Sequence, residues 1–304
     1  MYQYWGYGLL IESEIEFPEL LPYSFETPDA TITIGKTPDY LAGDNVLSRV
    51  RVQISPNEYL LKLLNIANYY VAEGSTVIVE PNAGADEKSI RLFLLSSAFA
   101  AILYQRNLIP LHASAIEYHD GVALFCGPSG LGKSTTVTML GQKGYKIFSD
   151  DVCVLRSSTE NGAIEALPSY PMVKLWEDSF SKLDIEMAGE DNRLRPQLPK
   201  YARFYHQEFN ISPKPIKKIF MLEKSKLIAK PEIEKLGPLS AFSEVQKNAY
   251  RSMQMNAMLK RNVHFEMISK LTMRTPCYKV GRPEFGNSVE ALCSLLETYL
   301  HLND

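Results

Sequence analysis

The chain has 304 residues, of which 45% are hydrophobic and 22% are charged, as is ordinary for a folded globular protein. Its net charge of −3 excludes the strongly basic composition of a general nucleic-acid or membrane binder, and we expect neither partner. Cys126, Cys153, Cys277 and Cys293 lack zinc-ligand spacing, which favours a reducing compartment without disulfides. The first residues do not read as a signal peptide, so we expect a cytoplasmic protein.

Residues 1–85 predict a mainly β N-terminal domain. β-Branched and aromatic runs at 7–11, 30–34, 69–72 and 75–80 are separated by turn-forming residues. Glu73 and Gly74 lie between the last two runs and predict a tight hairpin. This region contains no cluster of catalytic residue types.

The remaining residues, 86–304, predict a second domain that begins with a helix over 87–105. Asp86 and Glu87 are suited to the positive end of this helix. Its apolar run, 92–104, is shorter than the roughly 20 residues that cross a bilayer, so we expect a buried core helix.

The next stretch, 108–155, predicts alternating strands and helix. Strands are expected at 113–118 and 122–126, and a helix is expected at 134–143, ended by Gly144. Further strands at 145–148 and 152–155 frame two adjacent aspartates, Asp150 and Asp151.

Residues 127–134, GPSGLGKS, match the P-loop pattern G-x-x-x-x-G-K-[ST] at every fixed position. Glycines let successive backbone N–H groups face one anion, and the helix that follows adds its own donors. The pattern predicts that Lys133 reaches the β- and γ-phosphates and that Ser134 binds Mg²⁺. The predicted nucleotide contacts are Gly127, Ser129, Gly130, Leu131, Gly132, Lys133, Ser134 and Thr135.

Asp150 and Asp151 follow the P-loop after one helix and one return strand, so they can lie beside the phosphates. Two carboxylates suit two tasks, because one can hold the metal while the other accepts a proton from the attacking hydroxyl. His112 lies one hairpin before the loop, where a structural and a functional role are equally plausible. Residues 181–184, SKLD, match the guanine-reading element poorly, so ATP is preferred over GTP.

The rest of the chain predicts a long mobile loop and a mainly helical end. The loop, 184–208, carries Arg193, Arg195, Lys200 and Arg203. Strands are expected at 217–222 and 277–280, and helices are expected at 241–260, 264–273 and 287–300.

With His112, GPSGLGKS and SDD at matching spacing, the stretch 108–155 resembles the catalytic domain of HPr kinase/phosphorylase. The whole chain resembles HPr kinase-related proteins, on segments such as LIPLHASAI, LPSYPMVKLWEDS and CYKVGRP. The resemblance implies an α/β fold with a P-loop core and mixed sheet, similar to the nucleotide core of phosphoenolpyruvate carboxykinase. Some members resemble kinases that phosphorylate the C-terminal serine of a lasso-peptide precursor.

The resemblance also implies roles for individual residues. Asp150 would be the general base, while Asp151 and Ser134 would hold Mg²⁺, although the two aspartates can exchange roles. His112 and Lys133 would complete the catalytic set. Lys174, Lys200 and Arg203 would contact the transferring phosphate or an acceptor carboxylate, if they are more than solvated surface residues.

The sequence therefore predicts an ATP- and Mg²⁺-dependent serine kinase with a peptide substrate, and it leaves a homo-oligomer open. Two alternatives remain: a kinase of a small molecule or sugar, and a nucleotide-gated regulatory module without phosphotransfer. A screen of acceptors would separate the first alternative from the peptide kinase. The aspartate pair argues against the second, because a switch needs no base for a hydroxyl.

Overall fold

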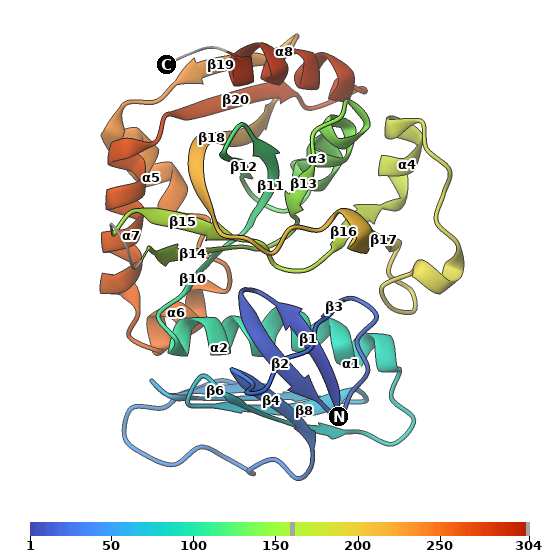
Figure 1. The fold of residues 1–304 in the computed structure, drawn as a ribbon, viewed down its shortest axis with the longest axis vertical. Helices are drawn as coiled ribbons and strands as arrows, with labels where there is room; N and C mark the ends of the chain where they lie inside the picture. Colours follow the sequence, from blue (N-terminus) through green and yellow to red (C-terminus); the bar gives the residue numbers. More distant parts are fainter. Residues whose placement is uncertain (159–161, 302–304) are drawn as a thin grey trace.

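The computed structural model describes residues 1–158 and 162–301, which form a mixed α/β fold with two large mixed sheets (Figure 1). The first sheet contains only strands from the N-terminal part of the chain, whereas the second contains strands from the remainder. A long helical segment lies between them. The predicted division into domains at residue 85 stays a prediction.

The first sheet joins antiparallel hairpins through parallel pairs β2–β4 and β4–β9. The strand predicted at 30–34 is confirmed as β4, and the predicted hairpin is confirmed between β8 and β9, where Glu73 and Gly74 have φ values of 52° and 64°. In sheet order, the strands are β3 (Leu21–Pro22), β1 (Tyr2–Gly6), β2 (Leu9–Ser13), β4 (Ala30–Ile34), β9 (Thr76–Pro81), β8 (Ala67–Ala72), β7 (Glu58–Leu63), β6 (Val52–Ile54) and β5 (Leu47–Ser48).

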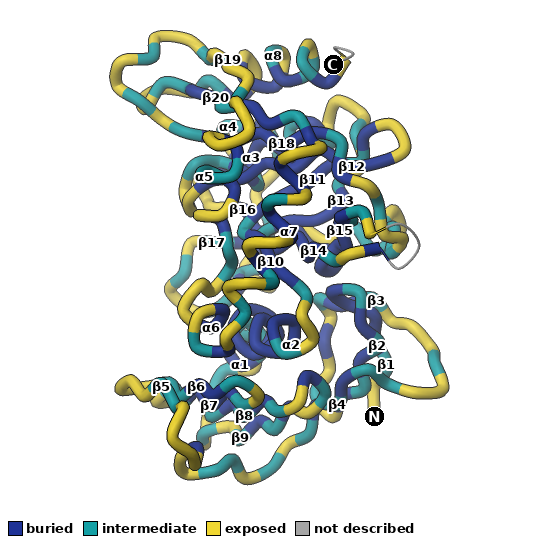
Figure 2. Tube along the Cα trace, turned by 90° about the vertical axis from the view of Figure 1, so that its left-hand side faces the viewer, coloured by how far each residue is buried: buried dark blue, intermediate teal, exposed yellow. Residues whose placement is uncertain are grey.

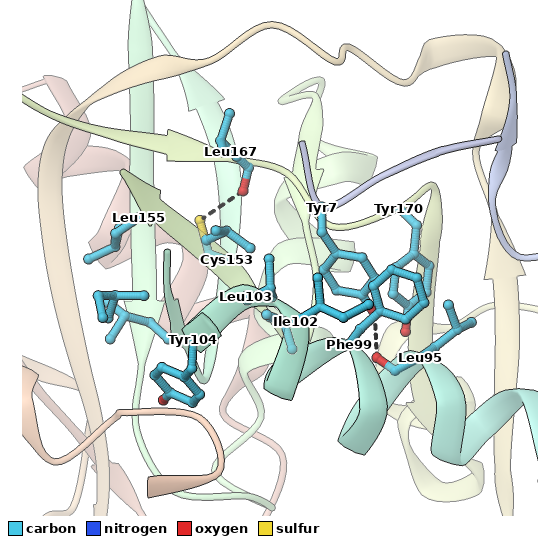
Figure 3. Close-up of a cluster of buried hydrophobic side chains, with 14 of the residues drawn as sticks. Tyr7, Leu95, Phe99, Ile102, Leu103, Tyr104, Cys153, Leu155, Leu167 and Tyr170 are labelled. Atoms are coloured by element: carbon cyan, nitrogen blue, oxygen red, sulfur yellow. Dashed lines mark hydrogen bonds between the residues drawn. The ribbon is translucent and has the colours of Figure 1, made fainter. Parts of the chain in front are cut away.

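The strand predicted at 7–11 is present but begins two residues later, as β2 (Leu9–Ser13), because Tyr7 and Gly8 form the turn between β1 and β2, with φ values of 58° and 79°. A non-glycine residue seldom adopts this conformation. Tyr7 is held in it by burial: its ring stacks on Phe99 at 5.0 Å, and its hydroxyl donates to the Leu95 carbonyl oxygen (Figure 3). Tertiary packing has therefore overridden local preference.

The helix predicted over 87–105 is confirmed, with one π-helical turn inside it. The segment consists of α1 (Glu87–Phe93), the π-helix η1 (Leu94–Ala98) and α2 (Phe99–Gln105), and Asp86 caps its start by accepting from Ser89 N. Figure 2 shows this segment buried between the first sheet and the rest of the molecule. Among the helices of the described residues, none is both long and apolar enough to cross a bilayer.

The second sheet carries the elements that surround the glycine-rich loop. Strands β12, β18 and β20 are parallel to one another, while β11 is antiparallel to β12. In order, the strands are β10 (Ile109–Leu111), β14 (Cys153–Ser157), β15 (Ile164–Leu167), β18 (Lys214–Ser225), β12 (Gly121–Cys126), β11 (Ala113–Tyr118) and β13 (Ile147–Ser149); β20 (Cys277–Pro283) pairs with β18 and with β19 (Glu232–Lys235).

The mobile loop predicted at 184–208 is wrong over its last third. Residues Lys200–Phe204 form β17, which pairs with β16 (Met172–Trp176) in a separate two-stranded sheet. Helix α4 (Glu177–Leu183) follows β16, and the short 3-10 helices η2 (Glu190–Asn192) and η3 (His206–Glu208) flank β17. In β17, buried and exposed residues do not alternate, and prolines and charged residues surround it, so it lacks the usual strand pattern.

The helix predicted at 241–260 is also wrong, because it is two helices, α5 (Pro238–Gln246) and α6 (Ser252–Ala257). The break is tertiary in origin: Tyr250 N donates to the Pro110 carbonyl oxygen, and Arg251 adopts a φ of 53°. Helices α7 (Arg261–Arg274) and α8 (Val289–His301) match the remaining helical predictions. Helix α3 (Lys133–Gln142) follows the glycine-rich loop.

Candidate active site

The loop 127–134 joins the buried strand β12 to helix α3, as the sequence predicts. Gly127, Gly130 and Gly132 have φ values of 138°, 82° and 90°, which favour glycine. A Cβ on Gly127 would lie 2.8 Å from the Leu222 carbonyl oxygen, so neighbouring β18 also requires glycine there. The loop is therefore shaped by backbone constraints that the sequence pattern satisfies.

Lys133 points back across this loop. Its Nζ donates to the carbonyl oxygens of Gly127 at 2.6 Å and Pro128 at 3.1 Å, and it lies 2.9 Å from His112 Nε2. An ammonium group can only donate, so Nε2 accepts and the His112 proton is assigned to Nδ1. That proton faces the Asp151 carbonyl oxygen at 2.9 Å. Burial, reinforced by the Lys133 charge, lowers the pKa of His112, which fits a neutral ring.

Asp151 presents its carboxylate to the same space from a backbone conformation with a φ of 67°. Its Oδ2 lies 2.8 Å from Lys174 Nζ, and both side chains are largely buried, with exposed fractions of 18% and 5%. Burial by itself would raise the pKa of Asp151, but the cations of Lys174 and Lys200 outweigh it and hold that pKa well below its usual range. Asp151 is therefore ionised at neutral pH.

Asp150 lies differently, although it is the neighbouring residue. Its side chain is buried, Oδ1 accepts from Ser114 Oγ at 2.6 Å, and Oδ2 accepts from Lys174 N at 2.9 Å. Both carboxylate oxygens are thus engaged by the protein. Asp150 connects β11, β13 and β16 behind the cavity that Asp151 faces.

A cavity of about 340 Å³ brings together most of the residues predicted from the sequence. Arg203 lies elsewhere, on a surface depression beside Phe204, and Gly127 and Leu131 face a second cavity across the loop. The predicted residues that line the first cavity are His112, Ser129, Gly130, Gly132, Lys133, Ser134, Thr135, Asp151, Lys174 and Lys200.

Several cavity residues were missed by sequence reasoning, notably Lys224 and Arg282. Lys224 Nζ donates to the Gly130 carbonyl oxygen at 2.9 Å, and Arg282 Nη2 donates to the Leu131 carbonyl oxygen at 2.9 Å. They lie at the carboxyl ends of β18 and β20, parallel to the strand that precedes the loop. Ligands bind at such strand ends in α/β sheets, and this rule could have found both residues.

The cavity is strongly cationic, so it is suited to a polyanion. Burial lowers the pKa of Lys133, of Lys200 and, with Arg282 nearby, of Lys224. A bound polyphosphate would relieve this crowding of positive charge. The cations that line the cavity are Lys133, Lys174, Lys182, Lys200, Lys224 and Arg282, facing Asp151 and Asp178.

The donor set fits a magnesium ion held jointly with phosphates. The Ser134 hydroxyl and the Asp151 carboxylate are hard oxygen ligands on the same cavity wall. In the described residues, no cluster of three or more His, Cys, Asp or Glu side chains could hold a metal by itself. Mg²⁺ is ordinarily bound by one or two carboxylates together with substrate phosphates and water.

Comparison with known proteins assigns no activity to the chain. No protein-family model matches the chain. No curated protein matches it either. Among solved structures, it is similar to the HPr(Ser) kinase/phosphatase from Coxiella burnetii, with a TM-score of 0.34 and 11% identity, over 62% of this chain and 89% of that chain. A similarity this distant carries no argument about activity.

Proposed function

We propose that the protein transfers the γ-phosphoryl group of ATP to a hydroxyl acceptor. The observation that carries this proposal is one cavity in which the glycine-rich loop, Lys133 and Ser134 face the ionised Asp151. Phosphoryl transfer requires mainly positioning and charge neutralisation, because little covalent chemistry falls to the protein. This cationic cavity supplies both.

Lys133 would leave the loop carbonyls to bind the β- and γ-phosphates, and His112 would orient it through the 2.9 Å contact with Nε2. Lys174 and Lys200 would neutralise charge that develops on the transferring group. Ser134 and Asp151 would hold Mg²⁺ together with the phosphates, and the metal would supply Lewis-acid neutralisation of the negative charge.

This assignment differs from the sequence prediction in the base alone: Asp151 keeps its predicted metal role and also takes the acceptor role predicted for Asp150. Asp151 would face the acceptor and the metal, whereas Asp150 would position β16 from behind the cavity. The low pKa of Asp151 makes it a weak base, so it would orient the acceptor hydroxyl and take its proton late in the reaction.

For the acceptor, we propose the serine hydroxyl of a peptide, in particular the C-terminal serine of a lasso-peptide precursor. This finer assignment is supported by the resemblance of segments such as LIPLHASAI, LPSYPMVKLWEDS and CYKVGRP to the HPr kinase-related proteins.

The test is label transfer from γ-labelled ATP, with Mg²⁺, to peptides that end in serine, in alanine or in neither. We expect label on the serine-ended peptides, none with Lys133→Ala, and full transfer with the control Lys270→Ala, which changes an exposed residue of α7. Transfer by Lys133→Ala at the wild-type rate would refute the catalytic proposal. Equal label on serine-ended and alanine-ended peptides would refute only the acceptor.

A further inference from the structure

The cavity beside the loop has two chemically different ends. At one end lie His112, Asp151, Lys174 and Lys200, the residues that surround a reacting phosphate in the proposed function. The other end lies past Thr135, between the start of α4 and the start of α8. Its lining mixes apolar, polar and charged side chains: Thr136, Asp178, Ser179, Lys182, Val289 and Leu292, with the charges of Lys224 and Arg282 close to Asp178 and Lys182.

The direction of a bound triphosphate follows from the loop. A P-loop lysine reaches the β- and γ-phosphates, so Lys133 and its neighbour His112 mark the γ end. The α-phosphate then lies toward the first turn of α3, which contains Thr135. Whatever the α-phosphate carries must continue away from Asp151, toward α4 and α8.

Packing and hydrogen bonds fix the position of the residues at this second end. Helices α4 and α8 both pack against α3. The Thr135 and Ser179 hydroxyl oxygens lie 3.1 Å apart, and Asn287 Nδ2 donates to the Lys182 carbonyl oxygen at 3.2 Å. Figure 1 shows α4 and α8 on different sides of α3. The two helix starts are thus fixed relative to the loop.

We propose that this end is a nucleoside subsite, an inference that rests on the proposed function. Val289 and Leu292 would provide the apolar contact for a purine ring, because a flat base gains by burying its faces. Asp178 would accept hydrogen bonds from the hydroxyl and amino donors of the nucleoside. Its carboxylate is 64% exposed at the cavity wall and is paired with Lys182 of the same helix.

Asp178 gives a sharp test because its charge and its hydrogen bonds act in opposite directions on the ligand. A carboxylate repels a triphosphate, so Asp178→Ala should leave the affinity for inorganic tripolyphosphate unchanged or higher. If Asp178 binds the nucleoside, the same variant should lose affinity for ATP. No electrostatic effect of removing a negative charge can produce that loss.

The experiment is calorimetric titration of the full chain with ATP and with inorganic tripolyphosphate. We expect the wild-type protein to prefer ATP, and Asp178→Ala to lose about tenfold in ATP affinity, which is the ratio that one hydrogen-bonding contact supplies. The matched control is Asp120→Ala, which removes another exposed, lysine-paired aspartate at the opposite end of β12 from the loop. This control should bind both ligands as the wild type does.

A second variant tests the apolar contact. Val289→Thr keeps the side-chain shape but places a hydroxyl against the base, so it should weaken ATP and spare tripolyphosphate. Equal wild-type affinity for the two ligands, or unchanged ATP affinity in Asp178→Ala, would overturn the subsite alone. Binding of neither ligand by the wild-type protein would overturn the proposed function as well.

Discussion

The buried ion pair between Lys174 and Asp151 allows a quantitative prediction about stability. In Lys174→Met, the Asp151 carboxylate keeps its burial but loses the cation 2.8 Å from Oδ2. Removing one partner of a buried pair ordinarily costs about 3–5 kcal/mol, because the other charge stays uncompensated. Since Asp151 is partly exposed and the positive charge of Lys200 still acts on it, we expect a loss of about 3 kcal/mol in the free energy of unfolding. The melting temperature should fall by roughly 5 °C.

The stability difference between Lys174→Met and the wild type should also depend on pH, in a direction that the Asp151 pKa determines. In the wild type, the folded-state pKa of Asp151 lies below its unfolded value, so its stabilisation is present above the unfolded pKa of about 4 and is lost as the pH falls further. In Lys174→Met, burial instead raises the Asp151 pKa, and protonation relieves the buried charge. The stability gap between variant and wild type should therefore narrow as the pH falls toward 4.

Urea unfolding, followed by circular dichroism at several pH values, measures this gap. The double variant Lys174→Met with Asp151→Asn should recover most of the lost stability, because no uncompensated charge remains. The control Lys217→Met breaks the exposed pair with Asp120, at 2.9 Å, and should change the free energy of unfolding much less, because solvent screens an exposed pair. A cost for Lys174→Met no larger than that of the control, or one independent of pH, would refute the reasoning.

Three further predictions address the loop and the aspartates. Gly132→Ala should destabilise the fold by about 1 kcal/mol and abolish ATP binding, because φ is 90° and the new Cβ would lie 2.9 Å from Arg282 Nη2. The control is Gly144→Ala, at a residue with a φ of 99° and open space around it. In unfolding measurements, this control gives the cost of the backbone conformation alone. Nitrogen NMR at pH 7 should find His112 neutral with its proton on Nδ1, and an imidazolium signal would contradict the assigned network. Asp151→Asn should lower the rate of label transfer by about 10²-fold or more, the range for a proton-transfer group. The rate of Asp150→Asn should stay within tenfold of the wild type per folded molecule. The reverse order of the two rates would restore Asp150 as the general base.

The elements around the loop could be predicted because local signals and the tertiary structure agree there. Strand β12 is a buried apolar run, and α3 ends where Gly144 follows. Where the local signals and the tertiary structure disagree, the prediction failed. Tyr7 is held in a turn by its contacts with Phe99 and Leu95. Helices α5 and α6 are separated by a backbone hydrogen bond from Tyr250 to Pro110. No local pattern encodes those contacts.

For the site, the motif identified the residues that belong to one continuous stretch of chain. It did not identify Lys224 and Arg282, whose approach depends on β18 and β20 pairing in parallel beside β12. A strand order is a long-range property, so the rule that ligands bind at strand ends points to these two residues only once the order of the strands is known. The prediction that Arg203 belongs to the site was wrong for a related reason. On β17, Arg203 is adjacent to Ala202, which pairs with Lys174, so the Arg203 side chain points to the opposite face of the sheet.

The divergence of Asp150 and Asp151 follows from one unusual backbone angle in the bend after β13. Asp150 directly follows β13 and turns inward, where Ser114 and the backbone of Lys174 bind both of its oxygens. Asp151 has a φ of 67°, which redirects the chain so that its carboxylate faces the cavity. Strain at a non-glycine residue persists only where surrounding contacts enforce it. Here those contacts are Lys174 on the carboxylate and His112 on the carbonyl oxygen, so the strained residue and the lysine of the loop are held by one network. Two identical side chains thereby lie in different environments: that of Asp150 is bound on both oxygens inside the fold, and that of Asp151 faces the cavity.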